Sequence, residues 1–182
     1  MPLGMRPAPL LAGLLALVCA LTVPAAARTA GAGSPAVRVA SASACHGSPA
    51  AIALCRMNAT RRAYGLRPLR RDPLLRRAAR QKAHDMVARH YFDHVSPTGQ
   101  TLRGRVAGTG WTRGRDSWRL GENLAWGAGS NSSPAALVRA WLRSPPHRRI
   151  MLSPSYRVVG VGHVPATPFG AAGATLVADF GS

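Results

Sequence analysis

The sequence predicts an α+β fold with a largely antiparallel sheet. Helical patterns fill the middle of the chain, and two strand patterns, over residues 159–162 and 175–180, close it with apolar residues at alternate positions. No strand alternates with a helix in the manner of a parallel βαβ sheet, and no internal repeat is visible. The length of 182 residues fits one domain with appendages.

The N-terminal segment resembles a secretory signal. Arg6 precedes an apolar run from Leu10 to Val23, and the small residues Ala25 to Ala27 offer a cleavage site. A membrane span needs about 20 apolar residues, so we expect cleavage and no stable span, with a retained anchor as the alternative. These patterns divide the chain into a signal peptide over 1–27, a flexible Ala/Ser/Gly/Pro leader over 28–50 and a folded domain over 51–182.

Two cysteines, Cys45 and Cys55, remain after removal of the signal. Secreted proteins fold in an oxidising environment, where a pair of cysteines favours a disulfide. We therefore predict a Cys45–Cys55 bridge, with two free thiols as the alternative.

The helices are predicted from caps and apolar spacing. A first helix begins near Ala51 and ends at Gly65. Asp72 caps a second, with Pro73 in its first turn, and this helix runs into Tyr91 and Phe92. These limits place His90 inside the helix and His94 just beyond its end.

The next segments surround two further polar residues. Residues 99–108 predict a short helix, and "GENLAWG" reads as a glycine-bounded loop around Glu122, the only glutamate of the chain. Another helix opens at Ser133 and should end at Ser144, because a residue before proline avoids the helical region. His147 then lies on a short turn or helix ending near Leu152. We expect Trp126 and Trp141 to lie in the core, because large aromatic side chains contribute most when buried.

The charge is strongly positive. Lysine and arginine number 24 against 6 aspartate and glutamate residues, a formal net charge of +18. This charge is sufficient for non-specific binding of polyanions, but no motif of a specific nucleic-acid reader is present. We therefore expect a solvated surface attracted to anionic cell-wall polymers, and no specific nucleic-acid partner.

Five fragments, in this order, carry a family resemblance: "NATRRAYGLRPLRRDPLLRRAARQKAHDM", "YFDHVSPTG", "GENLAWG", "WLRSPPHRRIML" and "VVGVGHV". Together they resemble the bacterial branch of the CAP superfamily, which includes cysteine-rich secretory, venom antigen and plant pathogenesis-related proteins. The resemblance spans about residues 54–181 and implies an α-β-α sandwich, secretion, and a cleft with two histidines and usually two acids. By motif, the histidines fall on His94 and His147 and one acid on Glu122. The second acid is missing, and Ser144 stands near its place.

Two imidazoles and one carboxylate form the ligand set of an open zinc site. His94 and His147 are therefore candidate ligands for zinc or a similar divalent cation, with Glu122 as a ligand or as a partner of a ligand. The sequence lacks the short HExxH spacing of many zinc enzymes. A buried hydrogen-bonded network that ties loops together is the alternative.

Three functional classes follow for the candidate residues His94, Glu122, Ser144 and His147. The first is a secreted module that binds a small lipid, glycan or peptide at or outside the cell envelope. The second is a metal-assisted, peptidase-like hydrolase with Glu122 or a histidine as general base. The third is a structural envelope protein. A serine nucleophile at Ser144 is disfavoured, because two prolines separate it from His147 and no GxSxG motif surrounds it.

Overall fold

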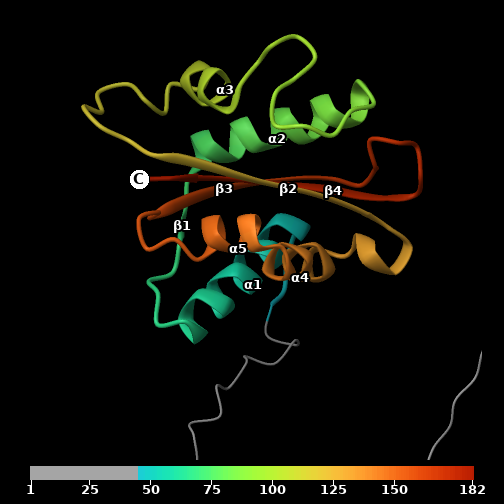
Figure 1. Ribbon diagram of the computed structural model, residues 1–182, viewed down its shortest axis with the longest axis horizontal. Helices are drawn as coiled ribbons and strands as arrows, with labels where there is room; N and C mark the ends of the chain where they lie inside the picture. Colours follow the sequence, from blue (N-terminus) through green and yellow to red (C-terminus); the bar gives the residue numbers. More distant parts are fainter. Residues whose placement is uncertain (1–44) are drawn as a thin grey trace, which may run out of the picture. The chain divides into compact units, whose positions relative to one another are not determined.

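The computed structural model of the protein describes residues 45–182 (Figure 1). The predicted signal peptide and residues 28–44 of the predicted leader lie outside the described residues. The elements run, in chain order, α1 (Pro49–Ala63), β1 (Arg70–Arg71), α2 (Pro73–Ala88), α3 (Leu102–Gly108), β2 (Leu120–Ala128), η2 (Gly129–Ser132), α4 (Pro134–Arg143), α5 (Pro145–Met151), β3 (Val158–Val164) and β4 (Gly173–Gly181).

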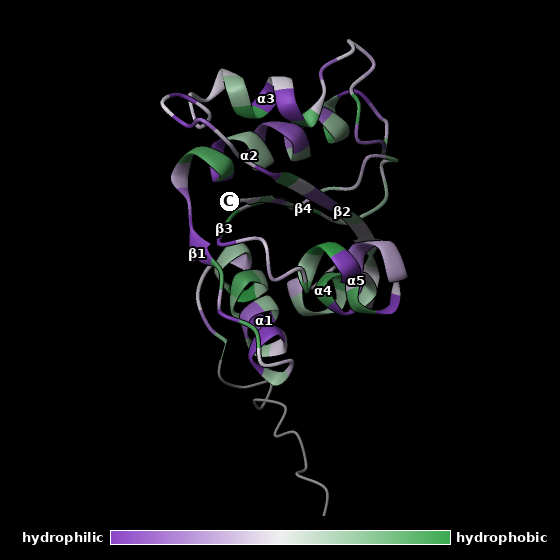
Figure 2. Cartoon of the chain, turned by 60° about the vertical axis from the view of Figure 1, so that its left-hand side comes forward, coloured by the Kyte–Doolittle hydropathy of each residue, from purple (hydrophilic) through white to green (hydrophobic). Residues whose placement is uncertain are grey.

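The sheet lies between two helical layers, which confirms the α-β-α sandwich. Its strand order is β1-β3-β4-β2. Figure 1 shows α2 and α3 on one side of the sheet and α1, α4 and α5 on the other. Strands β2, β4 and β3 pair antiparallel, but β1 pairs parallel with β3. The sheet is therefore mixed. Its parallel strand, β1, has only two residues, Arg70 and Arg71, and the sequence did not predict it; β1 is the purple strand at the left of Figure 2.

Helix starts follow the predicted caps. The Asp72 carboxylate accepts hydrogen bonds from the backbone N–H groups of Leu74 and Leu75, both at 2.9 Å, and starts α2 as expected. Ser48 caps α1, which therefore begins at Pro49 and not near Ala51. Likewise, α4 ends at Ser144 as predicted.

Helix α2 ends earlier than its sequence suggests. It stops at Ala88, and His90 has a φ of +55°, a left-handed conformation that few residues with a side chain adopt. The prediction that His90 is helical is therefore wrong. This left-handed residue follows the helix end and starts the segment that carries His94.

The "GENLAWG" segment is strand β2 and not a loop. Its glycines are typical of loops, but here they mark places where other groups approach the strand closely. A Cβ atom on Gly121 would lie 2.5 Å from the Tyr156 hydroxyl oxygen, and one on Gly127 would lie 2.3 Å from the Asn131 carbonyl oxygen. Placement in a strand fixes the direction of the Glu122 side chain, which a loop would not.

The core lies on both faces of the sheet. Trp141 is 1% exposed, as predicted, and its indole N–H donates to the Leu124 carbonyl oxygen at 2.9 Å, which ties α4 to β2. Trp126 is 39% exposed, so its predicted burial is wrong. It lies near the end of β2, where its ring packs edge-on against the exposed ring of Phe169.

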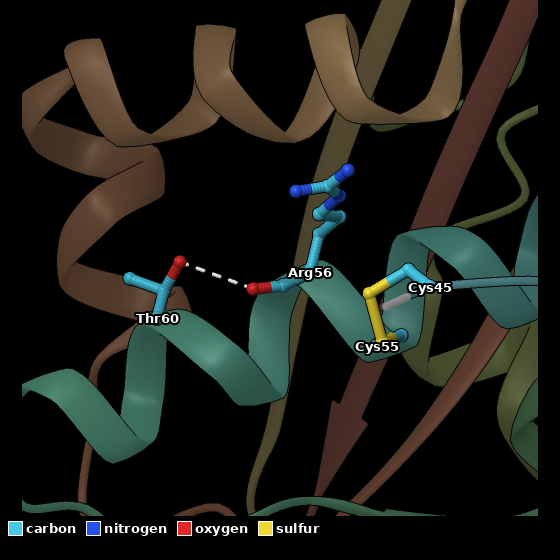
Figure 3. The surroundings of a disulfide bond; sticks show 4 residues. All are labelled: Cys45, Cys55, Arg56 and Thr60. Atoms are coloured by element: carbon cyan, nitrogen blue, oxygen red, sulfur yellow. Dashed lines mark hydrogen bonds between the residues drawn. A yellow bond between two sulfur atoms is a disulfide. The ribbon is translucent and has the colours of Figure 1, made fainter. Parts of the chain in front are cut away.

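The predicted disulfide between Cys45 and Cys55 is confirmed (Figure 3). It joins the first described residue to the second turn of α1, with the two Cα atoms 5.7 Å apart. The loop is short, so the expected stabilisation from restricting the unfolded chain is about 2 to 3 kcal/mol. One turn further along α1, the Thr60 hydroxyl donates to the Arg56 carbonyl oxygen at 3.1 Å.

Candidate functional site

The site is built on strand β2 by the register of the sheet. Arg119 and Ser182 exchange both of their backbone hydrogen bonds, at 3.0 and 3.2 Å, so every second pair from there is hydrogen bonded. Glu122 faces Asp179 at one of the alternate, non-bonded positions, where opposite side chains lie closest. Two carboxyl groups therefore share one face of the sheet.

Glu122 has a separate partner for each of its oxygens. The Arg105 guanidinium, from α3, donates to Oε2, and both side chains are almost completely buried. Oε1 lies 2.7 Å from Nδ1 of His94. Both oxygens are thus occupied by groups of the protein, and Glu122 acts as a partner of His94.

His94 lies in the segment after α2, with its side chain 57% exposed. The hydrogen bond to Glu122 raises the pKa of His94, although partial burial acts in the opposite direction. The imidazole is therefore anchored through Nδ1, which leaves Nε2 as the nitrogen that can face a ligand.

Hydrogen bonds from residues before and after His94 hold this segment against α2. The Tyr91 hydroxyl and the Ser96 hydroxyl both donate to Oδ2 of Asp85, the second at 2.7 Å. The fully buried Lys82 donates to the Tyr91 oxygen at 3.0 Å. Burial, followed by the Asp85 contact, raises the pKa of Tyr91 to about 12, so the phenol remains a donor at neutral pH. This hydrogen-bonded group holds the loop that presents His94.

His147 lies on α5, and contacts with Ser144 and Asn123 hold it in place. Its Nδ1 lies 2.7 Å from the Ser144 hydroxyl oxygen, at the junction of α4 and α5. Asn123, in β2, donates to the His147 carbonyl oxygen at 3.0 Å, which ties α5 to the strand next to Glu122. Burial lowers the pKa of His147, and the nearby charge of His94 lowers it further. His147 also keeps Nε2 for a ligand.

Asp179 is the second carboxyl of the site. It is completely buried on β4, and neither of its oxygens has a hydrogen-bond donor among residues 45–182. Burial raises the pKa of Asp179 well above its usual range, and the charge of Glu122 raises it further. Joint ionisation of two adjacent buried carboxyl groups is disfavoured, and burial acts on Asp179 in the direction of its protonated form.

Sequence reasoning missed Asp179, Arg105, Asp85 and Lys82. Alternation along β4 sets Asp179 on the face opposite Leu176 and Phe180 but does not indicate what covers that face; α2 and α3 do. A single acid in an otherwise apolar strand was the available signal. The sequence contains many arginines, and only the folded structure shows that Arg105 is the one that is buried and pairs with Glu122.

The described chain contains no group of three or more His, Cys, Asp or Glu side chains arranged to hold one metal ion. The donor set that remains for a cation is Nε2 of His94 and Nε2 of His147. Glu122 then orients a ligand without binding the metal, a common role for a carboxylate next to a histidine. The zinc hypothesis stays a prediction.

Two hollows of the surface lie away from these histidines. One, of about 730 Å³, lies along α2 and includes Arg76, Arg80 and His84; the other, of about 260 Å³, includes Leu54 and Val159. We place the candidate site at His94 and His147 because Glu122 anchors the first ring, Ser144 anchors the second, and the charge of His94 lowers the pKa of His147.

The family model of the CAP proteins, described as the cysteine-rich secretory protein family, matches residues 54–180. The chain belongs to this family. Two Bacillus subtilis proteins are similar to it: YkwD, 38% identical over 107 residues, and YlbC, described as a membrane protein, 34% identical over 106 residues. These matches cover 59% and 58% of the present chain but only 39% and 28% of the relatives.

Solved structures share the CAP fold. An extracellular protein of Bacillus anthracis containing an SCP domain has a TM-score of 0.59 and 26% identity, over 72% of this chain and 39% of that one. An outer surface protein of Borrelia burgdorferi has a TM-score of 0.59 and 22% identity, over 72% of this chain and 90% of that one. These neighbours are extracellular or surface proteins, and no helix within 45–182 of the present CAP domain is long and apolar enough to cross a membrane.

The pKa of His94 provides a direct test of this geometry. We expect His94 to titrate above the ordinary value of 6.5, and His147 to titrate below it. The contribution of the His94–Glu122 pair to stability is then complete below about pH 6.5 and is lost as the pH rises through the folded pKa of His94. Proton NMR titration, with the His94→Ala variant to assign the resonance, measures both values. A His94 midpoint at or below 6.5 would contradict the contact with Glu122.

Proposed function

We propose that this CAP domain is a secreted binding module, and that His94 and His147 together take one small ligand at or outside the cell envelope. The observation that carries the proposal is the matched anchoring of the two imidazoles. Glu122 holds one through Nδ1 and Ser144 holds the other through Nδ1. Each ring therefore offers Nε2, and a lipid, glycan or peptide group reaching the site meets two oriented nitrogens.

A divalent cation such as zinc is the second part of this proposal. Nε2 of His94 and Nε2 of His147 would hold it, with Glu122 fixing the tautomer of His94. A bound cation would polarise an oxygen of the ligand. Cation binding to the folded state alone stabilises it, by about 2.7 kcal/mol at a hundredfold excess over the dissociation constant.

The experiment is a thermal melt of untagged protein with and without zinc. We expect an upward shift in the wild type and in His90→Ala, a matched control from the same segment. The shift should disappear in His94→Ala and in His147→Ala. An unchanged shift in both of these variants would remove the cation from the proposal.

The alternative function is a hydrolase. The observation that favours it is the opposite direction of the two histidine pKa values, raised for His94 and lowered for His147. Such a pair supplies a general acid and a general base near neutral pH. Hydrolysis of a peptide or glycan by the wild type, lost in both His94→Ala and His147→Ala, would support this alternative over simple binding.

We also propose that the protein is retained by anionic cell-wall polymers. The three ion pairs within residues 45–182 use only two arginines, Arg89 and Arg105, while Arg76, Arg77 and Arg80 lie exposed on α2. Retention on isolated cell wall should therefore fall between low salt and about 0.5 M, where the screening length is about 4 to 5 Å. Retention that is independent of salt would point to a specific ligand or to an anchor.

A further inference from the structure

Several large apolar side chains of the domain lie exposed. Among residues 45–182 the large hydrophobic residues that lie exposed are Tyr64, Leu74, Phe92, Val95, Trp126 and Phe169. Four of these six belong to the segment after α2, to the end of β2 or to the loop between β3 and β4. Two of them, Trp126 and Phe169, are in contact, and exposed apolar side chains in contact mark a binding site more often than an isolated exposed residue does.

Trp126 and Phe169 are the two exposed rings that pack on each other. Their ring centroids lie 5.4 Å apart at an angle of 73°, an edge-to-face contact, with 39% of Trp126 and 57% of Phe169 exposed. We call this pair the aromatic ledge. An edge-to-face pair leaves one ring face open, and the open face of an aromatic ring carries the negative part of its quadrupole.

The ledge is held rigidly by its surroundings. His90, in its left-handed conformation, places Nδ1 3.0 Å from the Pro168 carbonyl oxygen, immediately before Phe169. Within the same loop the Thr167 hydroxyl donates to the Ala171 carbonyl oxygen at 2.8 Å. A strained backbone conformation that fixes an exposed ring is typical of a binding position, because the strain must be offset by the surrounding structure.

Trp126 of the ledge and Glu122, the anchor of His94, lie along the same strand, and one short segment joins the ledge to His94. Trp126 and Glu122 are four residues apart on the same face of β2, about 13 Å at the ordinary rise of a strand. The segment from His90 to His94 touches the ledge loop at one end and Glu122 at the other. Phe92, 38% exposed, lies midway along it. One elongated ligand can therefore contact both places.

The chemistry of this surface fits a sugar chain. Pyranose rings present polarised C–H groups that pack on an open aromatic face, and their hydroxyl groups need charged or polar partners nearby. Asp93 on the same segment, and Arg89 just before it, supply such groups, and both are exposed. A stable protein interface needs roughly 800 Å² from each partner, whereas an aromatic side chain offers at most about 150 to 250 Å². The ledge is too small for a stable protein partner.

We propose that the aromatic ledge of Trp126 and Phe169 is a glycan subsite, which takes pyranose units of a chain whose neighbouring part reaches His94. This inference rests on the proposed binding function and names its ligand class. Trp126 and Phe169 supply stacking surface, and Phe92 extends it toward the histidine. The ligand class is an extended polysaccharide chain.

The test is calorimetric titration of the full secreted chain with tetra-N-acetylchitotetraose, a soluble chain of β-linked N-acetylglucosamine. We expect wild-type binding that weakens by about tenfold or more in Trp126→Ala and in Phe169→Ala. Trp126→Phe should recover most of the affinity, because it restores a ring face. Tyr64→Ala removes an equally exposed aromatic ring from the end of α1 and should change nothing. His94→Ala should weaken binding by a smaller factor.

Each other outcome overturns the inference in a recognisable way. Absence of wild-type binding, or equal binding by the ring variants, removes the glycan subsite, while the zinc melts still decide the proposed function separately. Ring dependence with no effect of His94→Ala shows two unconnected sites and removes the joint ligand. Binding to vesicles of phosphatidylglycerol and phosphatidylcholine that depends on Trp126, without binding of the oligosaccharide, assigns the ledge to lipid. Circular dichroism of every variant shows that the fold is kept.

Discussion

Replacement of Arg105 by methionine is expected to lower the free energy of unfolding by about 3 to 5 kcal/mol. The guanidinium pairs with Glu122 where neither side chain reaches solvent, and its loss leaves a buried carboxylate beside a second carboxyl, Asp179. Removing one member of a buried ion pair costs this much because the remaining carboxylate then keeps only the half-exposed His94 as its partner. Urea unfolding at pH 7 measures the effect.

The same helix offers a matched control. Arg103 is exposed in α3 and lies 5.2 Å from the centroid of the Trp118 ring, so Arg103→Met should cost no more than about 1 kcal/mol. The double variant Arg105→Met with Glu122→Gln should recover part of the loss, because no unpaired charge then remains from the pair. Equal effects of Arg105→Met and Arg103→Met would contradict the buried pair.

Gly160→Ala is expected to be the most disruptive change outside the site, at about 3 kcal/mol or more. A Cβ atom on Gly160 would lie 2.0 Å from the backbone nitrogen of Arg76 and 2.0 Å from the backbone carbon of Leu75. No flexible side chain can give way there, so α2 must lift from β3, at the upper end of the cost of overpacking. The lift would also move the segment that carries His94. Thermal melting and the His94 titration measure the two effects.

Gly104→Ala is the control for that substitution. A Cβ atom at Gly104 would meet only the Thr101 hydroxyl oxygen, at 3.6 Å, an ordinary contact. Because alanine favours the helix, this change in α3 should be neutral or stabilising by up to about 1 kcal/mol. A Gly160→Ala protein that melts with the wild type would show that α2 does not seat on β3 as closely as described.

Helix caps, prolines and the cysteine pair in the sequence correctly predicted a helix start, a helix end and the disulfide. The Asp72 cap, the helix end at Ser144 and the disulfide all rest on interactions between residues close in the chain. The family motifs brought His94, Glu122 and His147 together as candidates, and the structure shows a hydrogen bond between the first two.

The remaining features depend on contacts between distant segments. Gly121 and Gly127 resemble loop residues until Tyr156 and Asn131 are seen packed against them. Asp179 becomes part of the site only through its register with Glu122 across the sheet. Trp126 is exposed because of its position on the strand, which its residue type does not reveal.

The central claim is that His94 and His147 form one binding site, each anchored through Nδ1. Nitrogen-detected histidine NMR during a zinc titration tests it most directly, because this measurement distinguishes Nδ1 from Nε2 in every ring. The account predicts that the Nε2 resonances of His94 and His147 move together and saturate at one equivalent of zinc, while His90 is unaffected. Movement of only one of the two rings, or saturation at different zinc concentrations, would contradict a shared site.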